Sequence, residues 1–176
     1  MKKLPKAEIK AIIRGADDLI FSGGRSLLAK VLKGSKEKKI YELKLDKSPV
    51  YGYFSGQKID DVLAKVNWCI KNGYLDIEYD YRLPLLVYTP KGWEIEKDIY
   101  SDELLEQINE VCFTKEYEFA KQLKDRNREL ILLLLDKIET SGRKQYVPFL
   151  MEWKKIDYKK VKKRINSVIC TLNEEQ

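Results

Sequence analysis

The spacing of hydrophobic residues predicts helices along most of this chain. The clearest helix runs from Ile59 to Asn72, where apolar residues recur at intervals of three and four and so share one face: Ile59, Val62, Leu63, Val66, Cys69 and Ile70. The segment from Lys6 to Phe21 has the same amphipathic pattern. A shorter helix is predicted from Arg25 to Lys33, because it ends at Gly34, a residue suited to a left-handed turn.

A change of period after Gly73 predicts a β-hairpin. Residues 75–81 alternate apolar and mostly acidic side chains, as a strand with one wet face does. Arg82-Leu83-Pro84 would turn the chain, and residues 85–89 would form the returning strand. Pro90-Lys91-Gly92 would then close the unit. The hairpin therefore has the place of a wing behind three helices.

Between the second predicted helix and the helix at Ile59 lie a short basic segment and a loop. Ser35 is a plausible N-cap for a basic helix that ends at Leu43, although Lys38 stands where a capping box needs an acid. The loop that follows, residues 46–53, contains Tyr51 and Tyr53 on either side of Gly52.

The second half of the chain is predicted to be helical. An apolar stripe over residues 104–112 continues into a second segment over residues 113–123, after a hinge near residues 93–101. The segment from Arg128 to Thr140 is apolar nearly all round and should be the central helix. A short helix from Val147 to Trp153 and a last helix from Asp157 to Cys170 follow.

Several short motifs in the first half resemble a known domain. The motifs are Leu32-Lys33-Gly34-Ser35, Lys39-Ile40, Pro49-Val50-Tyr51-Gly52, Ile70-Lys71-Asn72-Gly73-Tyr74-Leu75 and Leu86-Val87-Tyr88-Thr89. Their order and spacing resemble those of the RQC domain of RecQ-type DNA helicases. The resemblance covers about seventy residues. It implies a winged-helix fold that grips duplex or junction DNA through backbone phosphates, with a hairpin that separates strands in some members.

Together these patterns predict an α+β fold that is mostly α. We expect an N-terminal helical extension at residues 1–22, an RQC-like winged-helix domain at residues 23–98 and a C-terminal helical domain at residues 99–176. The chain has neither the G-x-x-x-x-G-K-[ST] motif nor a D-E-x-H box, so we expect a free-standing relative without the helicase motor.

Composition argues against catalysis. The chain has no histidine, and its three cysteines lie far apart, so histidine-based nucleophile pairs, imidazole ligands, disulfide frameworks and C-x-x-C metal sites are excluded. Paired carboxylates such as Asp60-Asp61 have an ordinary explanation as helix starts. We therefore expect no enzyme, no cofactor and no metal. Reduced cysteines and the lack of a long apolar run favour a cytoplasmic protein without a membrane contact.

The distribution of charge suggests where a polyanion would bind. Residues 23–58 contain nine basic and three acidic residues, whereas the segment from 59 to 126 is acidic. The candidate DNA-binding residues are Arg25, Lys33, Ser35, Lys36, Lys38, Lys39, Lys47, Tyr51, Tyr53, Lys58, Tyr81 and Arg82. The last helix would carry a second basic patch, formed by Lys154, Lys155, Lys159, Lys160, Lys162, Lys163 and Arg164.

Alternatives exist for each part of this hypothesis. Lysines commonly do no more than solvate a helical face, and Tyr51 could equally anchor its loop to the core. Trp68 should face outward and would either stack on nucleic acid or, as we favour, pack against the C-terminal half. Three acidic residues share one strand face of the wing and would repel phosphates: Asp76, Glu78 and Asp80.

Two other functions fit the same sequence. The acidic middle or the helical lobe could bind a protein partner, which would make the chain a protein-interaction adaptor on a winged-helix scaffold. RNA binding is the third hypothesis, because lysine contacts to phosphate do not distinguish the two sugars.

Overall fold

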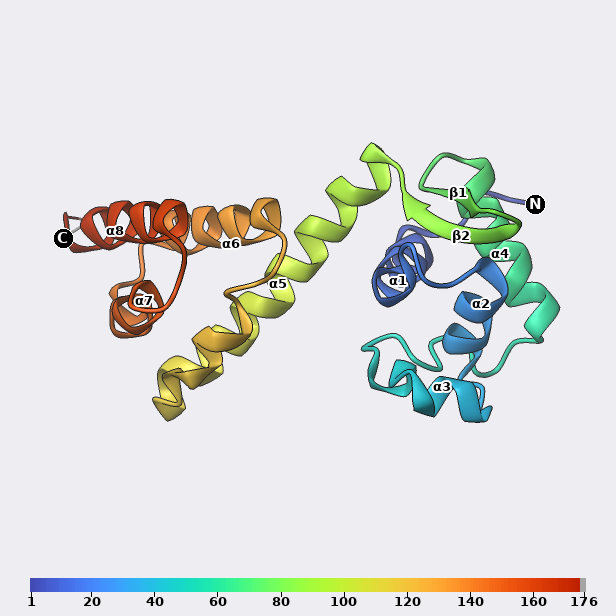
Figure 1. Ribbon diagram of the computed structural model, residues 1–176, viewed down its shortest axis with the longest axis horizontal. Coiled ribbons are helices and arrows are strands. Elements are labelled where there is room, and N and C mark those ends of the chain that lie inside the picture. The colour runs from blue at the N-terminus through green and yellow to red at the C-terminus, as the bar shows by residue number, and fades with distance from the viewer. Residues whose placement is uncertain (175–176) are drawn as a thin grey trace. The chain divides into compact units, whose positions relative to one another are not determined.

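The computed structural model describes residues 1–174; the last two residues of the expected C-terminal domain lie outside the described residues. The chain forms two compact units, one from Met1 to Glu96 and the other from Lys97 onward. The first contains the helices and the hairpin expected for a winged helix, and the second is helical (Figure 1). The predicted fold class, mostly α with a β-hairpin, is confirmed.

The helices of the first unit lie close to their predicted positions. They are α1 (Lys6–Ala16), α2 (Arg25–Lys33), α3 (Lys38–Glu42) and α4 (Ile59–Lys71), with short 3-10 turns at Asp17–Leu19 and Leu45–Lys47. The α2 and α4 helices pack side by side and α1 contacts both. Their apolar faces form one core in which Ile12, Leu32 and Val66 are fully buried. Lys65 of α4 also donates a 2.8 Å hydrogen bond to Glu8 of α1.

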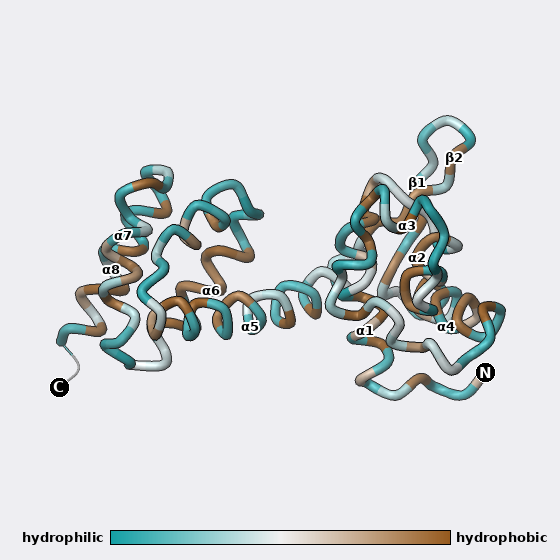
Figure 2. The backbone as a smooth tube through the Cα atoms, turned by 90° about the horizontal axis from the view of Figure 1, so that it is seen from below, coloured by the Kyte–Doolittle hydropathy of each residue, from teal (hydrophilic) through white to brown (hydrophobic). Residues whose placement is uncertain are grey.

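The hairpin consists of β1 (Leu75–Asp80) and β2 (Leu83–Tyr88), which pair antiparallel. The outer edge of β2 is held by the chain before α2, because the Leu86 amide donates to Gly23 O and the Leu86 carbonyl accepts from Phe21 N, both at 2.9 Å. The free end of the hairpin projects from the helices of its unit (Figure 2).

Two predictions about the hairpin were wrong. The turn is at Tyr81-Arg82, because Asp80 pairs directly with Leu83, and Pro84 lies inside β2 opposite Tyr79. A proline is tolerated near the start of a strand, so it did not mark the turn. Pro90-Lys91-Gly92 does not close the unit but begins α5 (Pro90–Thr114).

The expected hinge at residues 93–101 is also helical. Thr89 precedes α5 and its Oγ1 accepts a 3.0 Å hydrogen bond from the Gly92 amide, while Pro90 occupies the first turn. This Thr-Pro sequence starts a helix, whereas the sequence pattern predicts a stop. The boundary between the two units falls within α5, after Glu96.

The start of α5 is fixed in the first unit by a buried polar cluster. The Tyr88 hydroxyl lies 2.7 Å from the carbonyl oxygen of Ile13 and 2.8 Å from Glu96 Oε2, and Arg14 lies 3.9 Å from the same carboxylate oxygen. Burial, with the charge of Glu96 beside it, raises the pKa of the Tyr88 phenol, so this hydroxyl remains a donor. The cluster connects α1, β2 and α5.

The second unit contains the rest of α5 and the helices α6 (Arg128–Ser141), α7 (Val147–Lys154) and α8 (Lys159–Glu174). Residues predicted to continue a helix after α5 instead form a 3-10 turn at Tyr117–Gln122, and another lies at Lys144–Tyr146. The α8 helix packs against α6 and α7. Its predicted inward residues Val161, Ile165, Val168 and Ile169 are buried.

We expect Gly92→Ala to destabilise the first unit. A Cβ at position 92 would overlap with the carbonyl oxygen of Tyr74. This oxygen belongs to the backbone and cannot rotate away as the end of a side chain can, so the backbone at position 74 or at position 92 must shift. The expected loss of stability is about 3 kcal/mol, typical of overpacking a tight site. Urea denaturation followed by circular dichroism would measure it. The matched control is Gly56→Ala, where nothing lies within 4 Å of the new methyl group and stability should be unchanged; equal stability of both variants would contradict the close approach of the two backbones.

Candidate nucleic-acid interface

The candidate interface lies where the loop at residues 51–55 meets the end of α2. The carbonyl of Val31 accepts a 3.0 Å hydrogen bond from Gly52 N, and the carbonyl of Leu32 accepts a 2.8 Å bond from Phe54 N. The last carbonyls of a helix lack the usual donor four residues on. The Val31 carbonyl also accepts from the Gly34 amide at 3.0 Å, and the loop adds a second donor to it and a donor to the Leu32 carbonyl. The Tyr51 hydroxyl adds a 2.7 Å hydrogen bond to the carbonyl of Ser35.

Gly34 makes this junction sterically feasible. Its φ of +80° is left-handed, and a Cβ there would lie 3.0 Å from the Cα of Gly52. The Ser35 amide then donates back to Lys30 O at 2.9 Å, as in a Schellman cap. The predicted left-handed end of α2 is therefore confirmed.

A groove of 560 Å³ opens beside this junction, which we call the α2 groove. It is lined by Lys30, Lys33, Gly34, Ser35, Lys36, Glu37, Ser55 and Ile59. Three of the predicted contact residues, Lys33, Ser35 and Lys36, therefore lie together, and Lys58 is the residue before Ile59. Ser55, whose carbonyl accepts a hydrogen bond from the Lys33 ammonium, was not predicted. Only the loop's fold brings it to α2.

Ser35 has a different role from the one expected. The α3 helix begins at Lys38 and its preceding residue is Glu37, whose amide donates to Ser35 Oγ at 3.3 Å. Ser35 therefore shapes the turn before α3 and is not the N-cap. The reason is that Gly34 and Ser35 are used to end α2, which leaves the following residues to start α3.

A second groove of 480 Å³, the hairpin groove, adjoins the first because Lys30 and Glu37 line both. Its cationic residues are Arg25, Lys30 and Lys39. Its apolar lining comes from Leu27, Leu43, Leu83, Pro84 and Leu85. Leu43 and Leu83 are about half exposed, so this groove offers apolar as well as charged surface.

Some of the predicted cations have partners, and others have none. Lys38 lies 3.4 Å from Glu42, Lys47 lies 3.6 Å from Asp46, and Arg25 donates to Asn67 Oδ1 at 3.1 Å. The two ion pairs are largely exposed, and such pairs are weak. The side chains of Lys36, Lys39 and Lys58 are exposed and make no hydrogen bond or ion pair with any residue in the described range 1–174. These three therefore carry charge that no carboxylate among residues 1–174 compensates, as does the exposed Lys44.

The register of the hairpin places its acidic face. Asp80 pairs with Leu83 and Glu78 with Leu85, and cross-strand partners lie on one face of a sheet. The acidic residues therefore share a face of the wing with Leu83 and Leu85, whereas Pro84 is on the opposite face. The hairpin groove is lined by all three of these β2 residues and by none of the acids. Phosphates are therefore disfavoured along the body of the hairpin.

The aromatic candidates divide into exposed and anchored ones. Tyr81 is 98% exposed at the hairpin tip, with a left-handed φ of 55°, and Arg82 beside it is exposed too. Tyr53 is about half exposed and contacts Phe54 edge to face. Tyr51 is half-buried through its bond to Ser35. Trp68, expected on the outer face, is half-buried as well and stacks on Tyr74 within the first unit.

Comparison with known proteins agrees with this geometry. A family model described as the RQC domain matches residues 6–105, more than half of the chain. The chain belongs to the RQC domain family. This is a family of winged-helix nucleic-acid-binding domains, and the domain itself is not catalytic. The match begins at Lys6 and so includes α1. No curated protein and no solved structure matched the chain.

Metal sites and membrane spans are absent from the described part of this RQC-family chain. Within residues 1–174 no cluster of three or more histidine, cysteine or carboxylate side chains is arranged to hold a metal ion. No helix in that range has the length and apolar composition needed to cross a bilayer.

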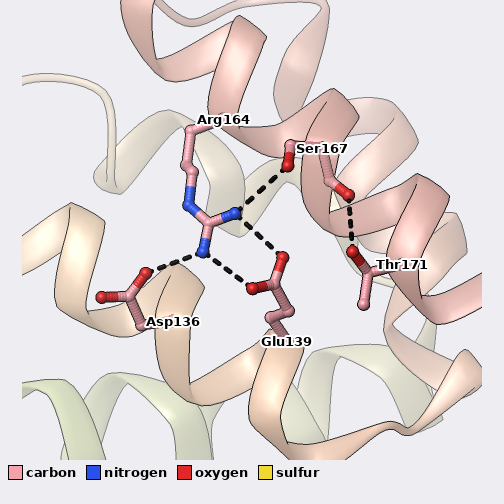
Figure 3. Close-up of polar contacts among 5 residues, drawn as sticks. All are labelled: Asp136, Glu139, Arg164, Ser167 and Thr171. Carbon is pink, nitrogen blue, oxygen red and sulfur yellow. Dashed lines mark hydrogen bonds and ion pairs between the residues drawn. The ribbon is translucent and has the colours of Figure 1, made fainter.

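The second basic patch is only partly as expected. Arg164, predicted to point outward, turns toward α6, where its guanidinium donates to Asp136 at 2.8 Å and to both oxygens of Glu139 at 2.9 and 3.1 Å (Figure 3). Lys155 pairs with Glu152 and Lys154 donates to Asn166. The exposed side chains of Lys159, Lys160, Lys162 and Lys163 have no such partner among residues 1–174.

The Arg164 ion pairs should make the second unit's stability depend on pH. Hydrogen bonding to Arg164 lowers the pKa of the Glu139 carboxyl, so this pair stabilises the fold above the unfolded pKa of about 4.3 and its contribution disappears as the pH falls through the lower, folded value. We expect Arg164→Gln to cost about 1 kcal/mol at pH 7 and almost nothing near pH 2.

Urea denaturation at a series of pH values would measure this difference. The control is Lys155→Gln, which removes an exposed pair and should have little effect at either pH. A cost of Arg164→Gln that stayed constant down to pH 2 would mean that packing, and not the charge pair, is responsible.

Proposed function

We propose that this RQC-family protein binds duplex or junction DNA without catalysing a reaction, mainly through backbone phosphates and with little sequence specificity. The observation that carries the proposal is the set of unpartnered lysines Lys36, Lys39 and Lys58. Lys36 lines the α2 groove, Lys39 lines the adjoining hairpin groove, and Lys58 precedes Ile59 of the α2 groove. Exposed ammonium groups without a carboxylate partner gain most from a phosphate, and they release counterions when they bind one.

The α4 helix is poorly suited to reading base edges. Its first turn carries Asp60 and Asp61, both exposed, which would repel a phosphate backbone that approached this helix end-on. The amide of Asn67, a residue type that could read adenine, already accepts from Arg25. We therefore assign phosphate contacts to the end of α2, to α3 and to Lys58, with Tyr81 and Arg82 as contacts at the wing tip.

Replacing Lys36, Lys39 and Lys58 together by glutamine should remove most of the binding. Each lysine–phosphate interaction that is removed should lower the slope of log affinity against log salt by roughly 0.9 for duplex DNA. Fluorescence anisotropy with duplex, forked, single-stranded and RNA probes across a salt series would measure both affinity and slope.

The matched control is the triple variant Lys3→Gln, Lys6→Gln and Lys10→Gln, which removes the same charge from exposed positions that line neither groove. It should keep nearly wild-type affinity. Equal decreases in the two variants would mean that net charge alone drives binding, and wild-type affinity in the groove variant would remove the α2 groove from the interface.

A protein-interaction function is the second candidate, and the hairpin groove favours it. Its half-exposed leucines and the acidic hairpin face beside them suit a segment of a partner protein with apolar and basic residues. If the protein bound none of the nucleic-acid probes at low salt, this candidate would replace DNA binding. Stronger binding to the RNA probe than to the DNA probes would assign the lysines to RNA.

A further inference from the structure

A second cationic pocket lies in the second unit, lined by residues that the sequence pattern does not predict as contacts and next to Lys162 of the predicted second basic patch. The loop before α6 folds against the start of α8, since the Tyr158 hydroxyl donates to Asp125 Oδ1 at 2.7 Å and the Lys124 ammonium lies 5.1 Å from the centre of the Tyr158 ring. The two segments enclose a pocket of 180 Å³. It is lined by Lys124, Asp125, Arg126, Arg128, Ile131, Tyr158 and Val161.

The charges of this pocket are largely uncompensated. Lys124 and Arg128 form no ion pair with a residue in the range 1–174. Arg126 donates to neutral oxygens, the carbonyl of Gln122 and the hydroxyl of Tyr100. The single carboxylate in the lining, Asp125, already accepts from Tyr158.

The start of α8 extends the same surface. Lys162 lies one turn after Tyr158 and so on the same side of the helix, and its exposed ammonium group has no partner among residues 1–174. Asp157, the acid nearest to this end of α8, is buried and accepts from the Trp153 indole and from Tyr158 N. The surface facing solvent here therefore carries one exposed carboxylate, Asp125, beside the four cations Lys124, Arg126, Arg128 and Lys162, and its net charge is positive.

We propose that this surface, formed by Lys124, Arg126, Arg128 and Lys162, is a second phosphate-binding site for the same nucleic acid that the first unit binds. The inference rests on the proposed function of the first unit. The proposed site differs from the basic patch predicted from the sequence. Lys154, Lys155 and Arg164 of that patch have polar partners within the unit, whereas the proposed site is formed by the loop before α6 and the start of α8, which meet only in the folded unit.

A nucleic-acid backbone fits this surface better than an acidic protein segment does. The lining is mainly charged and its apolar members, Ile131 and Val161, are buried, so little apolar surface is left to hold a side chain of a protein partner. Two phosphate-binding sites on one chain bind a long polyanion more tightly than either does alone, because the second binding step is intramolecular.

The test uses the full chain with Lys124→Gln, Arg128→Gln and Lys162→Gln. Anisotropy would be measured with a duplex of about one helical turn and with a duplex of about three turns, because only a longer polyanion offers enough phosphates to be held at two sites at once. We expect the affinity for the longer duplex to fall about tenfold or more, with little change for the shorter one. The salt slope for the longer duplex should fall by roughly 0.9 for each phosphate that is no longer neutralised.

A control with the same charge change is Lys115→Gln, Arg143→Gln and Lys144→Gln, at exposed positions of this unit outside the pocket. It should bind the longer duplex like the wild type. Circular dichroism of both variants would verify that they are folded.

The outcomes separate this inference from the proposed function. If the pocket variant keeps wild-type affinity and slope on the longer duplex while both values fall in the Lys36, Lys39 and Lys58 variant, the second site is refuted and the first stands. If the wild type binds neither duplex, the proposed function fails and this inference fails with it. If the pocket variant no longer binds polyglutamate but still binds DNA like the wild type, the surface is a protein-docking site and the inference is wrong.

Discussion

The end of α2 is the constraint on which the rest of the interface depends. Its last carbonyls need donors, and they find them in the cap at Gly34 and Ser35 and in the backbone of the loop at residues 51–55, through Gly52 and Phe54. This requires a left-handed Gly34 in close approach to Gly52. Once the two segments are joined, Lys30, Lys33 and Lys36 line one groove together with Ser55 and Ile59. Their approach is therefore a consequence of backbone hydrogen bonding, and no attraction between the cations themselves is needed.

The same junction explains why two short motifs carry a family resemblance. Leu32-Lys33-Gly34-Ser35 and Tyr51-Gly52 are separated in the sequence, yet Gly34 faces Gly52 and the Tyr51 hydroxyl bonds to the Ser35 carbonyl. Neither motif contains a base-reading or catalytic side chain. Their residue types are those needed to end a helix and to hold a loop against it. The motifs therefore indicate a shared backbone conformation and do not by themselves identify binding residues.

The spacing of apolar residues predicts the helices well, because burying one face of a helix requires apolar residues at intervals of three and four. The α2 and α4 helices and the central α6 helix end within a residue or two of their predicted limits. Proline and serine were less reliable as signals of where elements begin and end, since their meaning depends on the neighbouring residue. Pro90 follows Thr89 and starts a helix, Pro84 lies inside a strand, and Ser35 completes the end of one helix and does not cap the next.

Charge partners could not be predicted from the sequence, because they depend on which surfaces meet. Arg164 and Lys162 are two residues apart on α8, yet one faces carboxylates on α6 and the other faces solvent. Lys30 is paired with Glu37 at 2.9 Å while Lys36, next to Glu37, is not. A run of lysines therefore sets an upper limit on the charge available to a ligand, and the fold selects which members of the run remain available.

The wing shows how the two signs of charge are separated within one unit. Its acids Glu78 and Asp80 are paired across the strands with Leu85 and Leu83, whereas the unpartnered Lys36 lines the α2 groove. A phosphate backbone that followed the lysines past the hairpin body would meet Glu78 and Asp80, and the repulsion would grow as water was excluded. In the proposed mode of binding, a polyanion would therefore lie along the α2 groove and avoid the hairpin body, and Arg82 would be its cationic contact at the wing tip. The acids would then restrict where the nucleic acid lies, and the lysines would supply the attraction.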